Sequence, residues 1–293
     1  MSHNKKLINR VYLDCVQIIE SSNDTNIESK RKKLVNAYEK LTDSDDWETQ
    51  EFHSIVHELR VYDFVKRSGI AITASKDRFD GPDFETEFGY IECVCATKGK
   101  RGTPQRKELD EALNGTMNRS RATLPRLTSV ILDKQKKYVK YQTKDILKQI
   151  PCLIALGTSI FSEDFNSDLN LDNAQKILYG IGDQTLLFNA NTHSFEDTGG
   201  VELYAYSNKG YKGNNIEVGS DYFSEDSYKL ISGVILVNNR IVETLSNNCF
   251  NILLNPNAII SVDINKLSKF RYFYRYAIEE NGRNSYKWHV EET

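Results

Sequence analysis

The chain of 293 residues is 39% hydrophobic and 27% charged, with a formal net charge of −3. This composition is typical of a globular protein with a substantial core, and no window approaches the roughly twenty apolar residues of a membrane-spanning helix. The small negative charge argues against a general polyanion binder, although a local basic patch can still contact nucleic acid.

The first 48 residues predict a helical region. Apolar residues recur at helical spacing over residues 5–20 and 26–42, and a polar turn at 23–25 separates the two helices. The basic cluster at 30–33 is a solvated helix face or, alternatively, a phosphate contact. This helical pair could serve as a cap or as a dimer contact.

A third helix is predicted over residues 49–67, with Gly69 as its stop signal. His53 and His57 lie four residues apart on it, a spacing that metal ligands on a helix can have. Without a third ligand in the sequence, they are better interpreted as polar positions flanking the apolar face.

A strand at 70–73 and a hairpin follow this helix. Pro82 biases the chain toward an extended conformation, so Asp83 begins a short strand that runs to Thr86. Residues 90–96 form a buried strand whose one charge is Glu92. The hairpin can place Asp83 beside Glu92, and two such carboxylates form a hard-oxygen site suited to Mg²⁺ or Mn²⁺.

The next elements are a helix over residues 124–141 and a strand over 152–157. A helix between two strands allows the second strand to run parallel in the same sheet. Lys134 falls on the apolar stripe of this helix, where a lysine must meet an anion or extend to solvent.

A helix carrying Glu58, then Pro82-Asp83, then Glu92 resembles the PD-(D/E)XK nuclease superfamily over residues 50 to 160. The resemblance implies an α/β fold with a restriction-endonuclease-like central mixed sheet flanked by helices. It also implies that Asp83, Glu92 and the backbone carbonyl of Cys93 bind Mg²⁺ or Mn²⁺, which activates water for phosphodiester hydrolysis.

The sequence departs from the superfamily pattern at Val94, where a lysine usually follows the Glu by two residues. That lysine normally positions the attacking water and offsets transition-state charge. Lys134 is our first candidate for the missing cation, and Lys98 is the second. The alternative for Lys134 is a side chain whose ammonium reaches solvent near Asp133.

The resemblance also gives Glu58 a supporting role at the metal site, because it lies beside the apolar face of its helix. The alternative is a surface glutamate paired with Arg60 or Lys66.

A basic Gly/Pro-containing segment follows the hairpin, and we expect it to contact the phosphate backbone of DNA. The alternative is a solvated loop. The nucleic-acid-binding candidates are Lys98, Lys100, Arg101, Arg106, Lys107 and, on the next helix, Arg126.

The C-terminal half, residues 161–293, predicts a β-rich region packed on a nuclease-like core at 49–160. An acidic loop is expected at 161–173. Strand-like runs follow at 185–190, 201–207, 230–237, 250–254 and 259–262. Residues 269–276 alternate cations with aromatic side chains, which suits nucleic-acid contact or, alternatively, an edge strand with an aromatic inner face.

The expected function is therefore metal-dependent endonucleolytic cleavage of DNA, in restriction or phage defence by analogy, with catalytic residues Asp83, Glu92, Lys134 and Glu58. The alternative is an inactive nuclease-fold protein that binds nucleic acid or a protein partner. RNA stays open as a substrate, a homodimer is a possible arrangement, and no membrane association is expected. Five scattered cysteines and the lack of a signal-peptide core predict free thiols and a cytoplasmic location.

Overall fold

A computed structural model gives the conformation of most of the chain. It describes residues 3–41, 50–73, 81–96, 107, 111, 119–158, 167–189, 192–203, 206–209, 215–218, 221–237, 250–267, 271–280 and 283–291.

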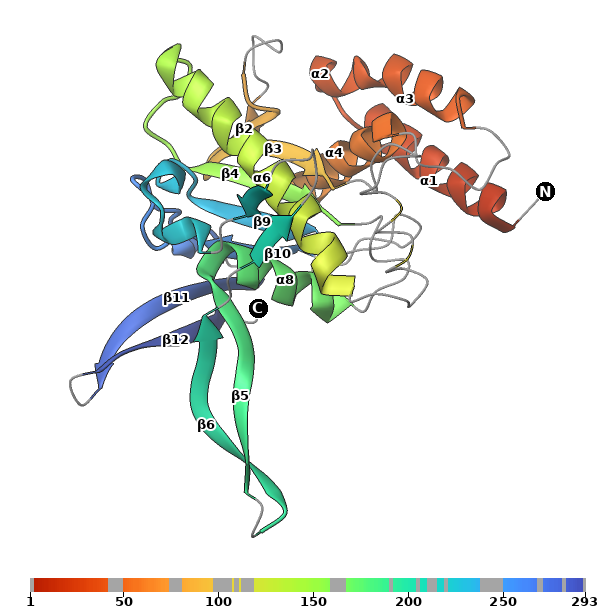
Figure 1. Ribbon diagram of the computed structural model, residues 1–293. Helices are drawn as coiled ribbons and strands as arrows, with labels where there is room; N and C mark the ends of the chain where they lie inside the picture. Colours follow the sequence, from red (N-terminus) through yellow and green to blue (C-terminus); the bar gives the residue numbers. More distant parts are fainter. Residues whose placement is uncertain are drawn as a thin grey trace.

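Four of the described α-helices lie within the first 67 residues, and two more follow after residue 118 (Figure 1). The helices are α1 (His3–Glu20), α2 (Thr25–Glu28), α3 (Lys30–Glu39), α4 (Gln50–Arg67), α6 (Arg119–Thr143) and α8 (Ser167–Tyr179). Short 3₁₀ helices lie at Tyr222–Ser224, Asp226–Tyr228 and Ile264–Leu267. Among the described helices, none is long and apolar enough to cross a membrane.

The centre of the molecule is a mixed sheet in the order β1-β2-β3-β4-β9-β10-β11-β12. Its strands are β1 (Ile72–Thr73), β2 (Phe84–Thr86), β3 (Gly89–Cys95), β4 (Cys152–Gly157), β9 (Gly233–Val237), β10 (Phe250–Leu254), β11 (Arg271–Glu280) and β12 (Arg283–Glu291). Separate hairpins pair β5 (Ile181–Asn189) with β6 (Ser194–Leu203), and β7 (Tyr206–Lys209) with β8 (Asn215–Val218).

Strand directions follow from the connections. The meander β1-β2-β3 is antiparallel, whereas β3, β4 and β9 are parallel to one another. Helix α6 supplies the crossover between β3 and β4, as the sequence predicted. The C-terminal strands β9 to β12 therefore extend the same sheet directly from β4.

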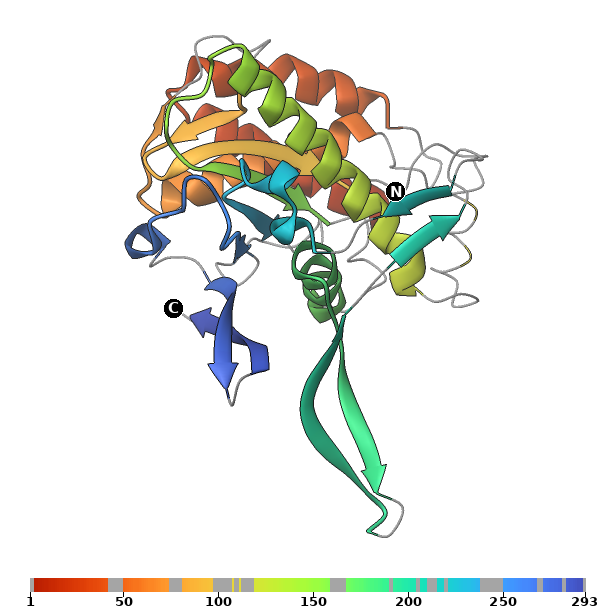
Figure 2. The same ribbon diagram turned by 60° about the vertical axis from the view of Figure 1, so that its left-hand side comes forward.

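Both faces of the central strands are covered, which explains their nearly continuous apolar sequences. Ile91, Cys93 and Leu153 pack in one core with helices α1 and α4. Tyr90 and Ile154, which alternate with them along β3 and β4, pack in a second core with α6 and α8. The two views show α1–α4 on one side of the sheet and α6 on the other (Figures 1 and 2).

Several predicted elements are confirmed with small shifts in their ends. Helix 49–67 is α4, and Gly69 ends it with a φ of 78°, in the left-handed region that glycine favours. The hairpin strands are β2 and β3, and the strand predicted at 250–254 is β10.

Other predictions were wrong. The expected loop at 161–173 overlaps α8, whose Ala174, Ile177 and Leu178 are buried at helical spacing. Residues 201–207 do not form one strand, because β6 ends at Leu203 and β7 begins at Tyr206. Residues 259–262 lie outside the described strands.

The aromatic run near the C-terminus is not an edge strand where it joins the sheet. Strand β11 lies between β10 and β12, and β12 is the outer strand. Beyond Phe273, β11 pairs only with β12. This hairpin and the β5–β6 hairpin extend from the body at the end away from the N-terminal helices (Figures 1 and 2).

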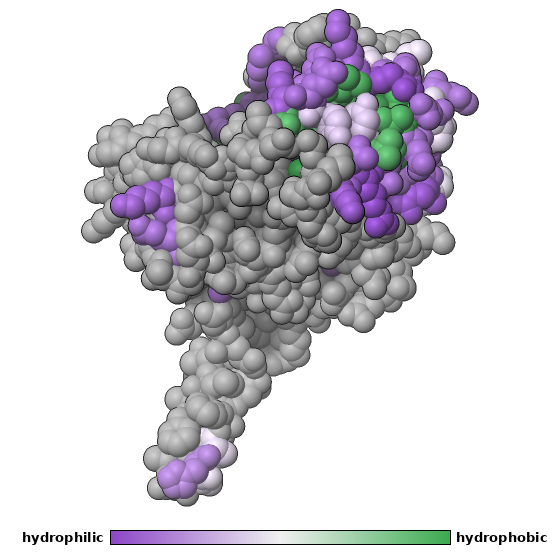
Figure 3. Space-filling view, turned by 90° about the vertical axis from the view of Figure 1, so that its right-hand side faces the viewer, coloured by the Kyte–Doolittle hydropathy of each residue, from purple (hydrophilic) through white to green (hydrophobic). Residues whose placement is uncertain are grey.

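The N-terminal helices present a mixed surface. Apolar side chains lie among hydrophilic ones on this face of the molecule (Figure 3). Leu13 on α1 is 49% exposed, whereas Val11 and Cys15, on either side of it in sequence, are buried in the core with α4.

Candidate active site

Glu92 lies in the middle of β3 with no exposed surface. Alternation along the strand places it between Tyr90 and Val94, on the face that α6 covers. A buried carboxylate is stable only with partners, and Glu92 has several. Lys134 Nζ donates to Oε2 at 2.7 Å, and Lys137 Nζ lies 2.8 Å from both Oε1 and Oε2.

Tyr141 completes the environment of Glu92. Its hydroxyl oxygen lies 2.7 Å from Glu92 Oε1 and 2.7 Å from the carbonyl oxygen of Gly81. A phenol has one proton, so it donates to one of these acceptors at a time. The hydroxyl thereby links α6 both to Glu92 and to the Gly-Pro-Asp segment before β2.

Helix α6 delivers these groups on one stripe. Lys137 and Tyr138 follow Lys134 by three and four residues, and Tyr141 follows them by four and three, which places all four on one side of the helix. Tyr138 is fully buried and donates its hydroxyl proton to the carbonyl of Leu153 at 2.6 Å. This bond anchors the stripe to the neighbouring strand β4.

Asp83 comes directly before β2 in the chain. Strand β2 pairs with β3 so that Phe84 faces Ile91, one residue after Asp83 and one residue before Glu92. Asp83 Oδ2 accepts a hydrogen bond from the backbone N–H of Cys93 at 2.7 Å. This bond ties the Asp83 carboxylate to the residue that follows Glu92 on β3.

Glu58 is near Asp83 but has a different partner from those expected. It forms an ion pair with Lys30 of α3, and not with Arg60 or Lys66. Burial raises the pKa of Glu58, and the negative charge of Asp83 raises it further. Glu58 therefore links α4 to α3 through its ion pair with Lys30, and its charge interacts with that of Asp83.

The histidines of α4 are buried, contrary to the prediction of flanking polar positions. His57 Nε2 lies 2.9 Å from the carbonyl oxygen of Ala155, and burial lowers the pKa of this imidazole to about 4. The neutral ring therefore donates its Nε2 proton to β4. Gly157 makes room for it, because a Cβ there would lie 2.7 Å from His57 Nδ1.

The remaining predicted positions contribute less to the described site. Val94 is half-buried and packs against the core beneath α6. Arg126 is half-buried on α6, and Lys107 lies 3.9 Å from Glu111. Lys98, Lys100, Arg101 and Arg106 lie outside the described residues.

Sequence reasoning missed Lys137 and Tyr141. The sequence did indicate them, because Lys137 and Tyr141 lie three and seven residues after Lys134 on the same side of the helix. That side was defined by its apolar residues, so Lys137 was not considered.

The side chains of this site offer few ligands for a divalent cation. Among the described residues, no three His, Cys, Asp or Glu side chains group together in a way that could hold a metal. Asp83 and Glu92 still offer hard oxygen donors on adjacent strands, which suits Mg²⁺ in kind. They fit such an ion on one condition: one of the ammonium groups on Glu92 must give way.

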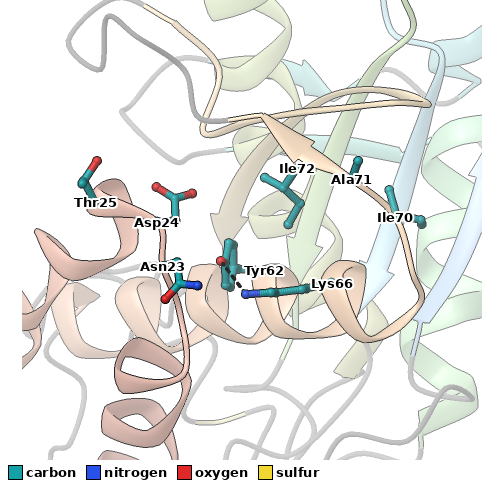
Figure 4. A pocket seen from close by; sticks show the side chains of 8 residues that line it. All are labelled: Asn23, Asp24, Thr25, Tyr62, Lys66, Ile70, Ala71 and Ile72. Carbon is teal, nitrogen blue, oxygen red and sulfur yellow. Dashed lines mark hydrogen bonds between the residues drawn. The ribbon is translucent and has the colours of Figure 1, made fainter.

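A separate groove of about 460 Å³ lies on the α4 side of the sheet. Turn residues 23–25, Tyr62 and Lys66 of α4, and residues 70–72 line it (Figure 4). Lys66 lies over the Tyr62 ring at 5.6 Å, and Tyr62 shares a 2.7 Å hydrogen bond with Ser22. The groove does not include Glu92 or its partners, so it is not part of the candidate active site.

Comparisons with protein-family models, with curated proteins and with solved structures found no match to this chain.

Proposed function

We propose that this chain is a divalent-metal-dependent endonuclease of the PD-(D/E)XK type that hydrolyses DNA phosphodiester bonds. The observation that carries the proposal is the 2.7 Å contact between Lys134 Nζ and Glu92 Oε2. It brings a cation from α6 to the carboxylate that lacks its usual lysine neighbour, because Val94 occupies that position. A cation in this position would stabilise the negative charge that develops on the phosphate during hydrolysis.

The arrangement of strands supports the same proposal. A helix, an antiparallel meander of three strands, a crossover helix and a parallel strand follow one another here. The restriction-endonuclease-like core that we propose has this order, with Asp83 directly before its second strand and Glu92 on its third.

Each residue would have a defined role. Asp83, Glu92 and the carbonyl of Cys93 would hold Mg²⁺ or Mn²⁺, which supplies an activated water and neutralises charge on the phosphate. Lys134 would orient the attacking water, and Tyr141 would fix Glu92 in place. Glu58 would act on the site through Asp83.

Phosphate contacts would come from the basic candidates beyond the hairpin. Charge-assisted hydrogen bonds to the phosphates of the DNA backbone would come from Lys98, Lys100, Arg101, Arg106, Lys107 and Arg126.

A second candidate is an inactive relative that binds nucleic acid or a protein partner. Val94 favours it, and so do the contacts at Glu92, whose carboxylate already accepts hydrogen bonds from two lysines. The two candidates differ in one measurable property, which is the cleavage of a phosphodiester bond.

The test is cleavage of plasmid DNA, single-stranded DNA and RNA with Mg²⁺, with Mn²⁺ and with a chelator. We expect cleavage that needs the metal and that Asp83→Ala lowers by about 100-fold or more. Asp133→Ala is the matched control, since Asp133 is exposed on α6. Equal cleavage by the wild type and Asp83→Ala would refute the proposal, and binding without cleavage would favour the inactive relative.

A further inference from the structure

Lys137 differs from Lys134 in its exposure to solvent. Its side chain is 40% exposed, against 16% for Lys134, although both donate to the same buried carboxylate. Its ammonium also lies 5.5 Å from the centre of the Tyr141 ring. Lys137 is therefore the cation that can leave Glu92 and regain water at the lower cost.

The carboxylate of Glu92 is closely surrounded by donors. Oε2 accepts from Lys134 and Lys137, and Oε1 accepts from Lys137 and, when its proton is not on the carbonyl of Gly81, from Tyr141. A carboxylate oxygen offers about two lone-pair sites. Because Lys137 contacts both oxygens, a divalent cation that binds either of them competes with Lys137.

Charge leads to the same conclusion. Asp83 and Glu92 carry two negative charges, and Lys134 and Lys137 carry two positive charges, so the group is neutral. A divalent cation would leave it with an excess of two positive charges in a largely buried site, which is unfavourable. A phosphate group that takes up Lys137 would offset part of this excess.

We propose that Lys137 competes with the divalent cation for Glu92 and that a DNA phosphate draws Lys137 away, so that metal and DNA bind cooperatively. This inference rests on the proposed nuclease function. By thermodynamic linkage, DNA then raises the affinity for metal by the same factor by which metal raises the affinity for DNA. Lys134 stays on Glu92 in both states.

The experiment is a calorimetric titration of the full chain with Mn²⁺, alone and with a short phosphorothioate DNA duplex that resists hydrolysis. Without DNA, we expect Lys137→Met to bind Mn²⁺ at least about tenfold more tightly than wild type, because a competing charge is gone. DNA should raise the metal affinity of wild type by a similar factor and that of Lys137→Met much less.

Two further variants separate charge from other effects. Lys137→Arg keeps the cation and should behave as wild type, whereas Lys136→Met removes an exposed charge on the same helix and should also leave metal affinity unchanged. Thermal unfolding of each variant checks that the fold is intact.

The outcomes distinguish the two proposals. If wild type cleaves DNA with metal but Lys137→Met has wild-type metal affinity, or if DNA raises both affinities equally, the role of Lys137 is wrong and the nuclease stands. If Mn²⁺ binds to none of the proteins with or without DNA, both proposals are wrong.

Discussion

At the scale of single residues, Glu92 shows how a buried charge depends on its neighbours. It has no exposed surface, and two ammonium groups and a phenol surround its oxygens. Removing one member of a buried ion pair usually costs more than the pair contributes, because the partner is left without compensation. The loss of stability expected from each substitution in this cluster therefore depends on how many partners the remaining charged groups keep.

We expect Glu92→Gln to lower the free energy of unfolding by roughly 3 kcal/mol, because it leaves Lys134 and Lys137 close together without an anion. Lys134→Met should cost about 1 kcal/mol, since Glu92 keeps Lys137 and Tyr141. Denaturant unfolding at neutral pH measures both values. A larger loss in Lys134→Met than in Glu92→Gln would contradict this description of the cluster.

A second prediction concerns pH and His57. The pKa of its imidazole is about 4 in the folded chain against an ordinary value of 6.5, because of burial. Unfolding therefore takes up a proton between these values, so stability is complete above pH 6.5 and falls as the pH is lowered toward 4. The loss should reach roughly 3 kcal/mol at the lower end.

The control for this prediction is His57→Gln, which keeps a donor for the carbonyl of Ala155 but does not titrate. The free energy of unfolding, measured from pH 7 to pH 4.5, should fall more steeply in wild type than in His57→Gln. Parallel profiles for the two proteins would show that His57 does not cause the loss.

At the scale of elements, the packing of α4 on β4 depends on a close approach at Gly157. A methyl group there would lie 2.7 Å from Nδ1 of the buried His57 ring, which is itself bonded to Ala155. The ring has little freedom to move aside, so the two elements would have to separate.

Gly157→Ala should therefore destabilise the protein by about 1–3 kcal/mol. In a His57→Ala background the same change should cost much less, because the obstructing ring is absent. A double-mutant cycle by thermal or denaturant unfolding measures this coupling. Additive effects of the two substitutions would argue against the contact.

The elements also show what the sequence could and could not predict. Helix α4 was predictable because its apolar residues follow the helical period, and the buried strands β3 and β10 because each is a short, nearly continuous apolar run. Helix α8 was not, because acidic and amide residues at its start conceal the spacing of Ala174, Ile177 and Leu178. The spacing of apolar residues in a sequence predicts a helix reliably only where the buried stripe of that helix is long.

The candidate site was predictable in part for a physical reason. Asp83 and Glu92 lie on a hairpin, whose partners are set by nearby sequence, and Lys134 stands out as a charge in an apolar stripe. The pairing of Glu58 with Lys30 was not predictable, because it depends on how α3 packs against α4. Contacts between distant segments need the tertiary structure.

At the scale of the whole molecule, the sheet places β3 between β2 and β4, with helices on both faces. Glu92 is therefore held by the interior of the fold, whereas its cations come from one face of one helix. The carboxylate and its two lysine partners therefore belong to different elements, β3 and α6. The central claim is that Lys134 is the cation that acts in phosphodiester cleavage.

The most direct test compares Mg²⁺-dependent DNA cleavage by wild type, Lys134→Ala and Lys136→Ala at saturating DNA. We expect Lys134→Ala to lower the rate by about 100-fold or more while DNA binding changes little, because its cation stabilises the transition state. Lys136→Ala, which removes an exposed lysine of the same helix, should cleave at the wild-type rate. Cleavage by Lys134→Ala at the wild-type rate would contradict the account.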